Sequence, residues 1–111
     1  MNSGNSALIE LEPGVVATML AAGEAVLIDV REPEEWTRAH IAGAFLHPLS
    51  QFDPDEWPRF FDRTAVLACL AGTRSAKVGR ALLAAGHPTA MHMKGGLDAW
   101  RAAGLPVVSE D

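Results

Sequence analysis

The 111-residue sequence contains a single cysteine, Cys69, which excludes a disulfide within the chain. It has no apolar run long enough to span a bilayer, and its opening residues, MNSGNSA, have neither the basic segment nor the apolar core of a signal peptide. Basic residues are also few, because 9 Lys and Arg stand against 14 Asp and Glu and give a net charge of −5. Nucleic-acid binding needs a basic face. We therefore expect a soluble protein of the reducing cytoplasm that binds neither nucleic acid nor a membrane.

The length and composition suit one globular domain. A content of 49% hydrophobic and 21% charged residues is ordinary for a soluble protein, and 111 residues give one core rather than two. The first residues are small and polar, so we expect residues 1–6 to be disordered, residues 7–108 to form the domain and residues 109–111 to be a frayed tail.

Short apolar runs alternate with helical patterns along this domain. The run 25–30, AVLIDV, is apolar on both faces until Asp29, which is typical of a central strand in a sheet covered on both sides. Further strands are expected at residues 7–11, 44–46, 65–68 and 89–93. Helices are expected at residues 13–22, from Pro33, at residues 75–85 and at residues 97–103. This alternation predicts an α/β domain with a mostly parallel five-stranded sheet and helices on both faces.

The stretch 50–62, SQFDPDEWPRFFD, interleaves aromatic and polar residues. We expect a helix through its middle despite Pro58, with the aromatic side chains packed on the sheet. Whether the region from Phe52 to Phe61 also docks a partner protein is left open.

Cys69 is the residue in this chain best placed for chemistry, because it lies where a buried strand gives way to a helix. The turn after it is Leu70-Ala71-Gly72-Thr73-Arg74, followed by Ser75. The glycine permits tight backbone geometry, the small side chains leave amide N–H groups uncovered, and the arginine supplies a cation if it turns inward. Amides, helix dipole and cation all favour the thiolate, which is the reactive nucleophile. The alternative is a small core residue, but the turn favours a functional thiol.

Asp29 and Arg31 close the strand at residues 25–30. If both strands belong to one parallel sheet, these two side chains approach the same rim as Cys69, where ligand sites gather. A structural ion pair with neighbours such as Glu34 or Glu35 is the alternative, and we favour it over direct chemistry.

The four histidines do not form a metal-binding pattern. His40, His47, His87 and His92 show neither a helical HExxH spacing nor a cysteine-pair spacing, so no metal site is expected. His40 is expected to be a hydrogen-bonding residue beside a turn. No histidine can be named as the base of a cysteine–histidine pair.

Three segments, in order, resemble the single-domain rhodanese-like sulfurtransferases. Residues 27–48, LIDVREPEEWTRAHIAGAFLHP, look like the family's strand, Asp-Val-Arg, acidic turn and Gly-His-Ile-x-Gly-Ala stretch, with Ala39 in place of the glycine. Residues 69–75, CLAGTRS, look like its catalytic loop. Residues 93–107, MKGGLDAWRAAGLPV, look like its closing Gly-Gly-x-x-x-Trp segment.

The resemblance implies that the chain is an enzyme of the thiosulfate sulfurtransferase type. Cys69 would take a sulfane sulfur from a small anionic donor such as thiosulfate, hold it as a persulfide and pass it to cyanide or to a thiol or protein acceptor. The N–H groups of Leu70 to Ser75 would surround the persulfide, and Arg74 would help to hold the donor. No metal and no organic cofactor is implied.

Two alternative functions stay open. A phosphatase or arsenate reductase of the related cysteine-loop type resembles a larger ring with arginine six positions after cysteine, whereas Arg74 follows Cys69 by five. A non-catalytic rhodanese-like binding or sulfur-delivery module usually lacks the cysteine, which is present here.

Overall fold

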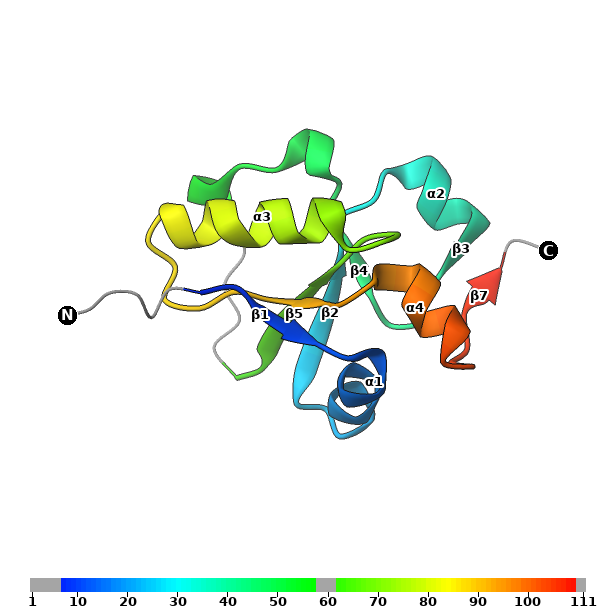
Figure 1. Cartoon of the computed structure of the whole chain (residues 1–111). Helices are drawn as coiled ribbons and strands as arrows, with labels where there is room; N and C mark the ends of the chain where they lie inside the picture. The colour runs from blue at the N-terminus through cyan, green and yellow to red at the C-terminus, as the bar shows by residue number, and fades with distance from the viewer. Residues whose placement is uncertain (1–6, 58–61, 110–111) are drawn as a thin grey trace.

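The computed structural model describes residues 7–57 and 62–109 (Figure 1). Most expected elements are present within a residue or two of their expected ends. The strands of the main sheet are β1 (Ile9–Leu11), β2 (Ala25–Asp29), β4 (Phe45–Leu46), β5 (Thr64–Ala68) and β6 (Met91–Met93). The helices are α1 (Pro13–Ala21), α2 (Pro33–Arg38), α3 (Thr73–Ala84) and α4 (Gly96–Ala102).

The main sheet has five parallel strands in the order β1-β6-β5-β2-β4. Every residue of β2 is buried, as the apolar run predicts for a central strand. β2 and β5 pair over their whole length, so Asp29 lies opposite Ala68, the residue before Cys69. The parallel register therefore brings the end of β2 and the start of the cysteine loop to one rim.

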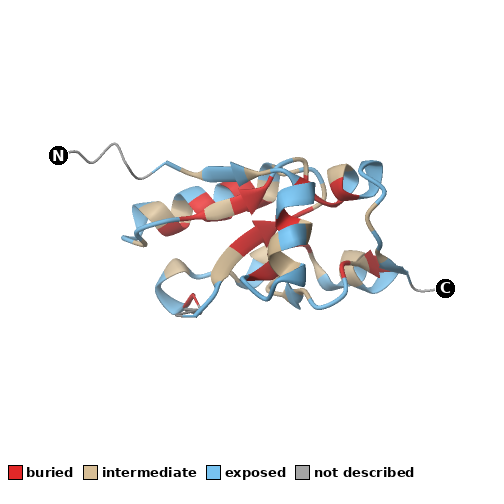
Figure 2. Ribbon diagram, turned by 90° about the horizontal axis from the view of Figure 1, so that it is seen from below, coloured by how far each residue is buried: buried red, intermediate tan, exposed pale blue. Residues whose placement is uncertain are grey.

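Helices cover both faces of this sheet, as expected (Figure 1). On one face, Val16 of α1 and Leu97 and Trp100 of α4 pack with alternate residues of β2 and β5. On the other face, Val78 and Leu82 of α3 pack with Ile28 of β2, Leu67 of β5 and Cys69. Figure 2 shows the buried residues concentrated on the central strands and on parts of the helices. The cysteine thus belongs to the layer between the sheet and α3.

The expected helix within residues 50–62 is wrong for the part that the structure describes. The chain instead forms two 3₁₀ turns, η2 (Leu49–Gln51) and η3 (Pro54–Glu56), because Pro54 and the Asp53 side chain, which accepts from the Asp55 N–H, set a short turn. Trp57 is buried against the α3 face and Phe52 packs beside it, as expected for the aromatics. Phe60 and Phe61 lie outside the described residues.

A second, two-stranded sheet was not predicted. β3 (Ala39–His40) pairs antiparallel with β7 (Val108–Ser109), so Ser109, which the sequence places in a frayed tail, lies in a strand. Residues 1–6 and 110–111 lie outside the described part of the chain. Within the described part, no helix is both long and apolar enough to cross a bilayer.

Candidate active site

Cys69 directly follows β5 and lies at the N-terminal end of α3. Its side chain is 2% exposed, in the layer between the sheet and the helix. The Val30 N–H donates to the Ala68 carbonyl at 2.9 Å, which ties the ends of β2 and β5 together immediately before the thiol. The predicted position of the cysteine at a helix entrance is confirmed.

Backbone amides of the loop point at the sulfur. The N–H groups of Gly72 and Ser75 donate to Cys69 Sγ at 3.1 and 3.3 Å. Gly72 has a φ of +100°, a left-handed conformation that a side chain disfavours, and this turns the chain back over the thiol. The two amides and the positive end of the 12-residue helix α3 both favour the thiolate form.

The other four loop amides add further donor capacity. The N–H groups of Leu70, Ala71, Thr73 and Arg74 donate to no acceptor within residues 7–57 and 62–109. The side chains of Ala71 and Thr73 are exposed, and that of Leu70 packs toward the α1 and α4 face. These four N–H groups are therefore available as donors to a bound anion.

The start of α4 lies beside the cysteine loop (Figure 1) and binds its backbone. The N–H groups of Leu97 and Asp98 donate to the carbonyl oxygens of Cys69 and Leu70, both at 2.9 Å. A Cβ at Gly96 would collide with those same two carbonyls, so this close approach needs glycine. Anchoring the carbonyls on α4 keeps them away from the sulfur.

Arg74 does not point at the sulfur but forms a two-pronged ion pair with Glu35 of α2. Its guanidinium nitrogens lie 2.7 and 2.9 Å from the two carboxylate oxygens. The hydrogen bonds from Arg74 hold the pKa of Glu35 at about 2, below its ordinary 4.5, and the pair raises the pKa of Arg74, with smaller contributions from nearby Cys69 and Asp29. The Arg74 guanidinium thus lies beside the loop, and its charge is paired with that of Glu35.

This ion pair predicts an acid-sensitive contribution to stability. Because the folded-state pKa of Glu35 is depressed, the stabilisation is complete above about pH 4.5 and is lost as pH falls through about 2. For a partly exposed pair we expect about 1 kcal/mol. In urea unfolding, Glu35→Gln should be less stable than the native chain by that amount near pH 7, and the difference should shrink as pH falls toward about 2 and vanish below it. Glu34→Gln, an exposed neighbour on α2, is the control; a deficit of the same size for both variants would contradict the role of the pair.

Asp29 and Arg31 form a buried ion pair with each other. The Arg31 guanidinium donates to the Asp29 carboxylate at 2.8 and 3.0 Å and to the Ala39 carbonyl at 2.8 Å. The expectation of a structural ion pair is therefore right, but Glu34 and Glu35 are wrong as its carboxylate partners; Glu35 contributes only its backbone carbonyl, at 3.4 Å. Asp29 and Arg31 fix α2 to the end of β2, and α2 in turn presents Glu35 to Arg74.

The structure also brings Ser75 of the predicted loop together with two polar side chains that the sequence analysis missed, His92 and Glu10. His92 Nδ1 of β6 lies 2.8 Å from Ser75 Oγ, and Ser75 Oγ lies 3.5 Å from Cys69 Sγ. The other ring nitrogen of His92, Nε2, lies 3.0 Å from a carboxylate oxygen of Glu10 in β1. A polar residue between Met91 and Met93 in a buried strand was the available signal.

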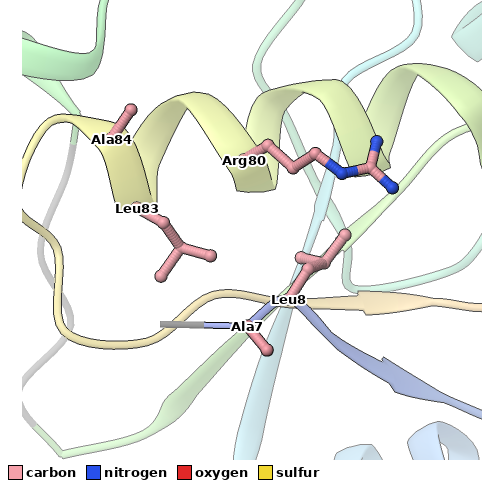
Figure 3. A pocket seen from close by; sticks show the side chains of 5 residues that line it. All are labelled: Ala7, Leu8, Arg80, Leu83 and Ala84. Atoms are coloured by element: carbon pink, nitrogen blue, oxygen red, sulfur yellow. The ribbon is translucent and has the colours of Figure 1, made fainter. Parts of the chain in front are cut away.

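A surface hollow elsewhere on α3 is not part of this site. Figure 3 shows it beside the C-terminal half of the helix and the segment before β1, lined by Ala7, Leu8, Arg80, Leu83 and Ala84. Cys69 stands at the opposite end of α3. No three His, Cys, Asp or Glu side chains are grouped so that they could hold a metal ion in the part of the chain that the structure describes.

Known proteins resemble this chain both in sequence and in fold. A family model described as the rhodanese-like domain matches residues 12–103. The thiosulfate sulfurtransferase GlpE of Actinobacillus succinogenes is 28% identical over 101 residues, which are 91% of each chain. The protein slr1261 of Synechocystis is 35% identical over 97% of this chain, which spans only 60% of that relative's length. A crystal structure of a rhodanese-related protein from Thermoplasma volcanium superimposes with a TM-score of 0.76 at 25% identity, over 90% of this chain and 97% of that one.

Proposed function

Because the chain belongs to the rhodanese-like domain family, we propose that it is a sulfurtransferase that carries sulfane sulfur as a persulfide on Cys69. The observation that carries the proposal is the loop around the thiol, in which two amides donate to the sulfur. Four more amides from the same loop have no acceptor within the described part of the chain. A loop of this kind stabilises a thiolate, and its remaining amides are donors for one further anionic sulfur.

The proposed reaction consists of two displacements at sulfur. The Cys69 thiolate attacks the outer sulfur of thiosulfate, the sulfur–sulfur bond of the donor breaks, and its electron pair leaves on sulfite. An acceptor thiolate or cyanide then attacks the outer sulfur of the persulfide, and the electron pair of the broken bond returns to Cys69. One nucleophile serves both steps, and the loop amides stabilise the charge on sulfur in each.

The name of the GlpE relative supports thiosulfate as the donor to test first. An anionic donor also fits a loop that carries the Arg74 cation, whose charge interacts with Cys69. We assign the activity to the cytoplasm, because a carrier with one cysteine needs a reduced thiol between turnovers.

Arg74 is predicted to assist donor binding. Arg74→Ala should raise the KM for thiosulfate about tenfold with a smaller change in kcat, and Arg74→Lys should retain part of the effect because it keeps the charge without the planar fork. Steady-state thiocyanate formation measures both constants. Arg80→Ala removes an exposed positive charge from the same helix and should leave both unchanged. Native constants for Arg74→Ala would remove this residue from the donor site.

Initial-rate kinetics test the function itself. If the persulfide is an obligatory intermediate, double-reciprocal plots against thiosulfate at several cyanide concentrations are parallel, as in a ping-pong mechanism. Intersecting lines would mean that donor and acceptor bind together, and no thiocyanate at any concentration would favour a non-catalytic module.

A further inference from the structure

We propose that His92 and Glu10 act as positioning residues that draw the proton from Cys69 through Ser75. The inference rests on the proposed function, in which Cys69 reacts as a thiolate. It adds to that function a proton acceptor, which neither the loop nor the family comparison supplies.

The contacts form one unbroken line from the sulfur to the surface. Cys69 Sγ is 3.5 Å from Ser75 Oγ, Ser75 Oγ is 2.8 Å from His92 Nδ1, and His92 Nε2 is 3.0 Å from Glu10 Oε2. Ser75 and His92 are 0% and 1% exposed, whereas the Glu10 side chain is 53% exposed. The line therefore connects a buried thiol to a solvated carboxylate through two buried groups.

The Glu10 carboxylate fixes which group donates and which accepts in each hydrogen bond of this chain of contacts. A carboxylate only accepts, so Nε2 carries the hydrogen that faces Glu10, and Nδ1 is left as an acceptor. The Ser75 hydroxyl has two acceptors in reach, His92 Nδ1 at 2.8 Å and the Gly72 carbonyl at 3.3 Å, and the shorter contact favours the histidine. The Ser75 oxygen is then free to accept from the Cys69 thiol.

A proton moves along this line without loss of atoms or charge. The S–H bond of Cys69 breaks and its proton goes to Ser75 Oγ, while the Ser75 hydroxyl proton goes to His92 Nδ1. The products are a thiolate, which Gly72 and Ser75 amides hold, and an imidazolium, which the Glu10 carboxylate holds. Both new charges are paired, as buried charges need to be.

Three elements place titratable or polar groups around the histidine. β1 contributes Glu10, the end of β5 contributes Cys69, and α3 contributes the neutral Ser75 hydroxyl. Lys94, two residues after His92, lies 3.7 Å from Glu12 rather than on the ring. Arg74 acts on the Cys69 side and is paired with Glu35.

The pH dependence of the Cys69 thiolate tests the proposal in the intact chain. With one cysteine and no tyrosine in the sequence, ultraviolet thiolate absorbance reports Cys69 alone, with Cys69→Ser as the blank. Glu10→Gln should move the midpoint of thiolate formation upward by about one pH unit, which is about tenfold less thiolate below the midpoint. His92→Asn keeps an acceptor for Ser75 but cannot hold a proton, and should shift the midpoint in the same direction.

Two controls separate this role from a structural one. Glu12→Gln removes the same charge from the exposed carboxylate that faces Lys94 and should leave the midpoint unchanged. In a Ser75→Ala background, Glu10→Gln should add no further shift, because the line is already cut. Native midpoints for Glu10→Gln and His92→Asn, or a full additional shift in the Ser75→Ala background, would overturn the proposal. The absorbance does not depend on sulfur transfer, so a chain that forms no persulfide would refute the proposed function and not this titration.

Discussion

Replacing Cys69 with alanine should abolish the proposed transfer of sulfur from thiosulfate to cyanide, and the chain should still fold. In the proposed mechanism both displacements run through this sulfur, so kcat/KM should fall at least about a thousandfold. The side chain is small and only part of the α3 face of the core, so its loss should cost stability about 1 kcal/mol. Thiocyanate formation and thermal unfolding measure the two effects.

Cys69→Ser serves as the matched variant. It keeps the size of the side chain and a polar atom for the amides of Gly72 and Ser75, but a serine hydroxyl in this loop is not a comparable nucleophile for sulfur. Both variants should therefore be inactive and folded. Thiocyanate formation at the native rate by either one would show that Cys69 is not the nucleophile.

The second large effect is expected from Gly96→Ala. The new methyl group would lie against the carbonyls of Cys69 and Leu70, and the residue has a φ of +62°, so the substitution strains the backbone and pushes the loop away from α4. Overpacking and left-handed strain together should cost about 2–4 kcal/mol of folding free energy. Sulfur transfer should fall further than stability predicts, because the displaced loop no longer aims its amides at the sulfur.

Gly104→Ala is the control for strain alone. Gly104 also has a positive φ, +78°, but nothing lies within 4 Å of the position of its Cβ. It should lose only about 1 kcal/mol and keep its activity. Equal losses of stability and activity for the two variants would show that contact between α4 and the loop does not position the site.

The parts of the fold predicted best are those in which one segment determines its own structure. The run at β2 is apolar on both faces, which requires a sheet covered on two sides, and β5 ends at a turn whose glycine and small residues indicate a helix start. The position of the cysteine loop at the rim of the sheet was predicted from the parallel pairing of these two strands. The 3₁₀ turns near Pro54 and the two-residue strands β3 and β7 carry too short a pattern to predict.

The parts of the site that sequence reasoning missed depend on contacts between distant segments. Arg74 and Glu35 are 39 residues apart, and His92 and Glu10 are 82 apart. Neither pair has a spacing that periodicity detects. For the second pair, the strand order places β1 and β6 side by side only after folding. His92 lies within the strand expected at residues 89–93, but its two partners, Ser75 and Glu10, come from the fold.

The mass of the intact protein after incubation with thiosulfate and removal of excess donor tests the central claim most directly. The account predicts one added sulfur atom per native chain, its loss on addition of cyanide, and no addition to Cys69→Ser. A native chain whose mass is unchanged by any sulfane donor, or a Cys69→Ser chain that gains the same sulfur, would contradict it.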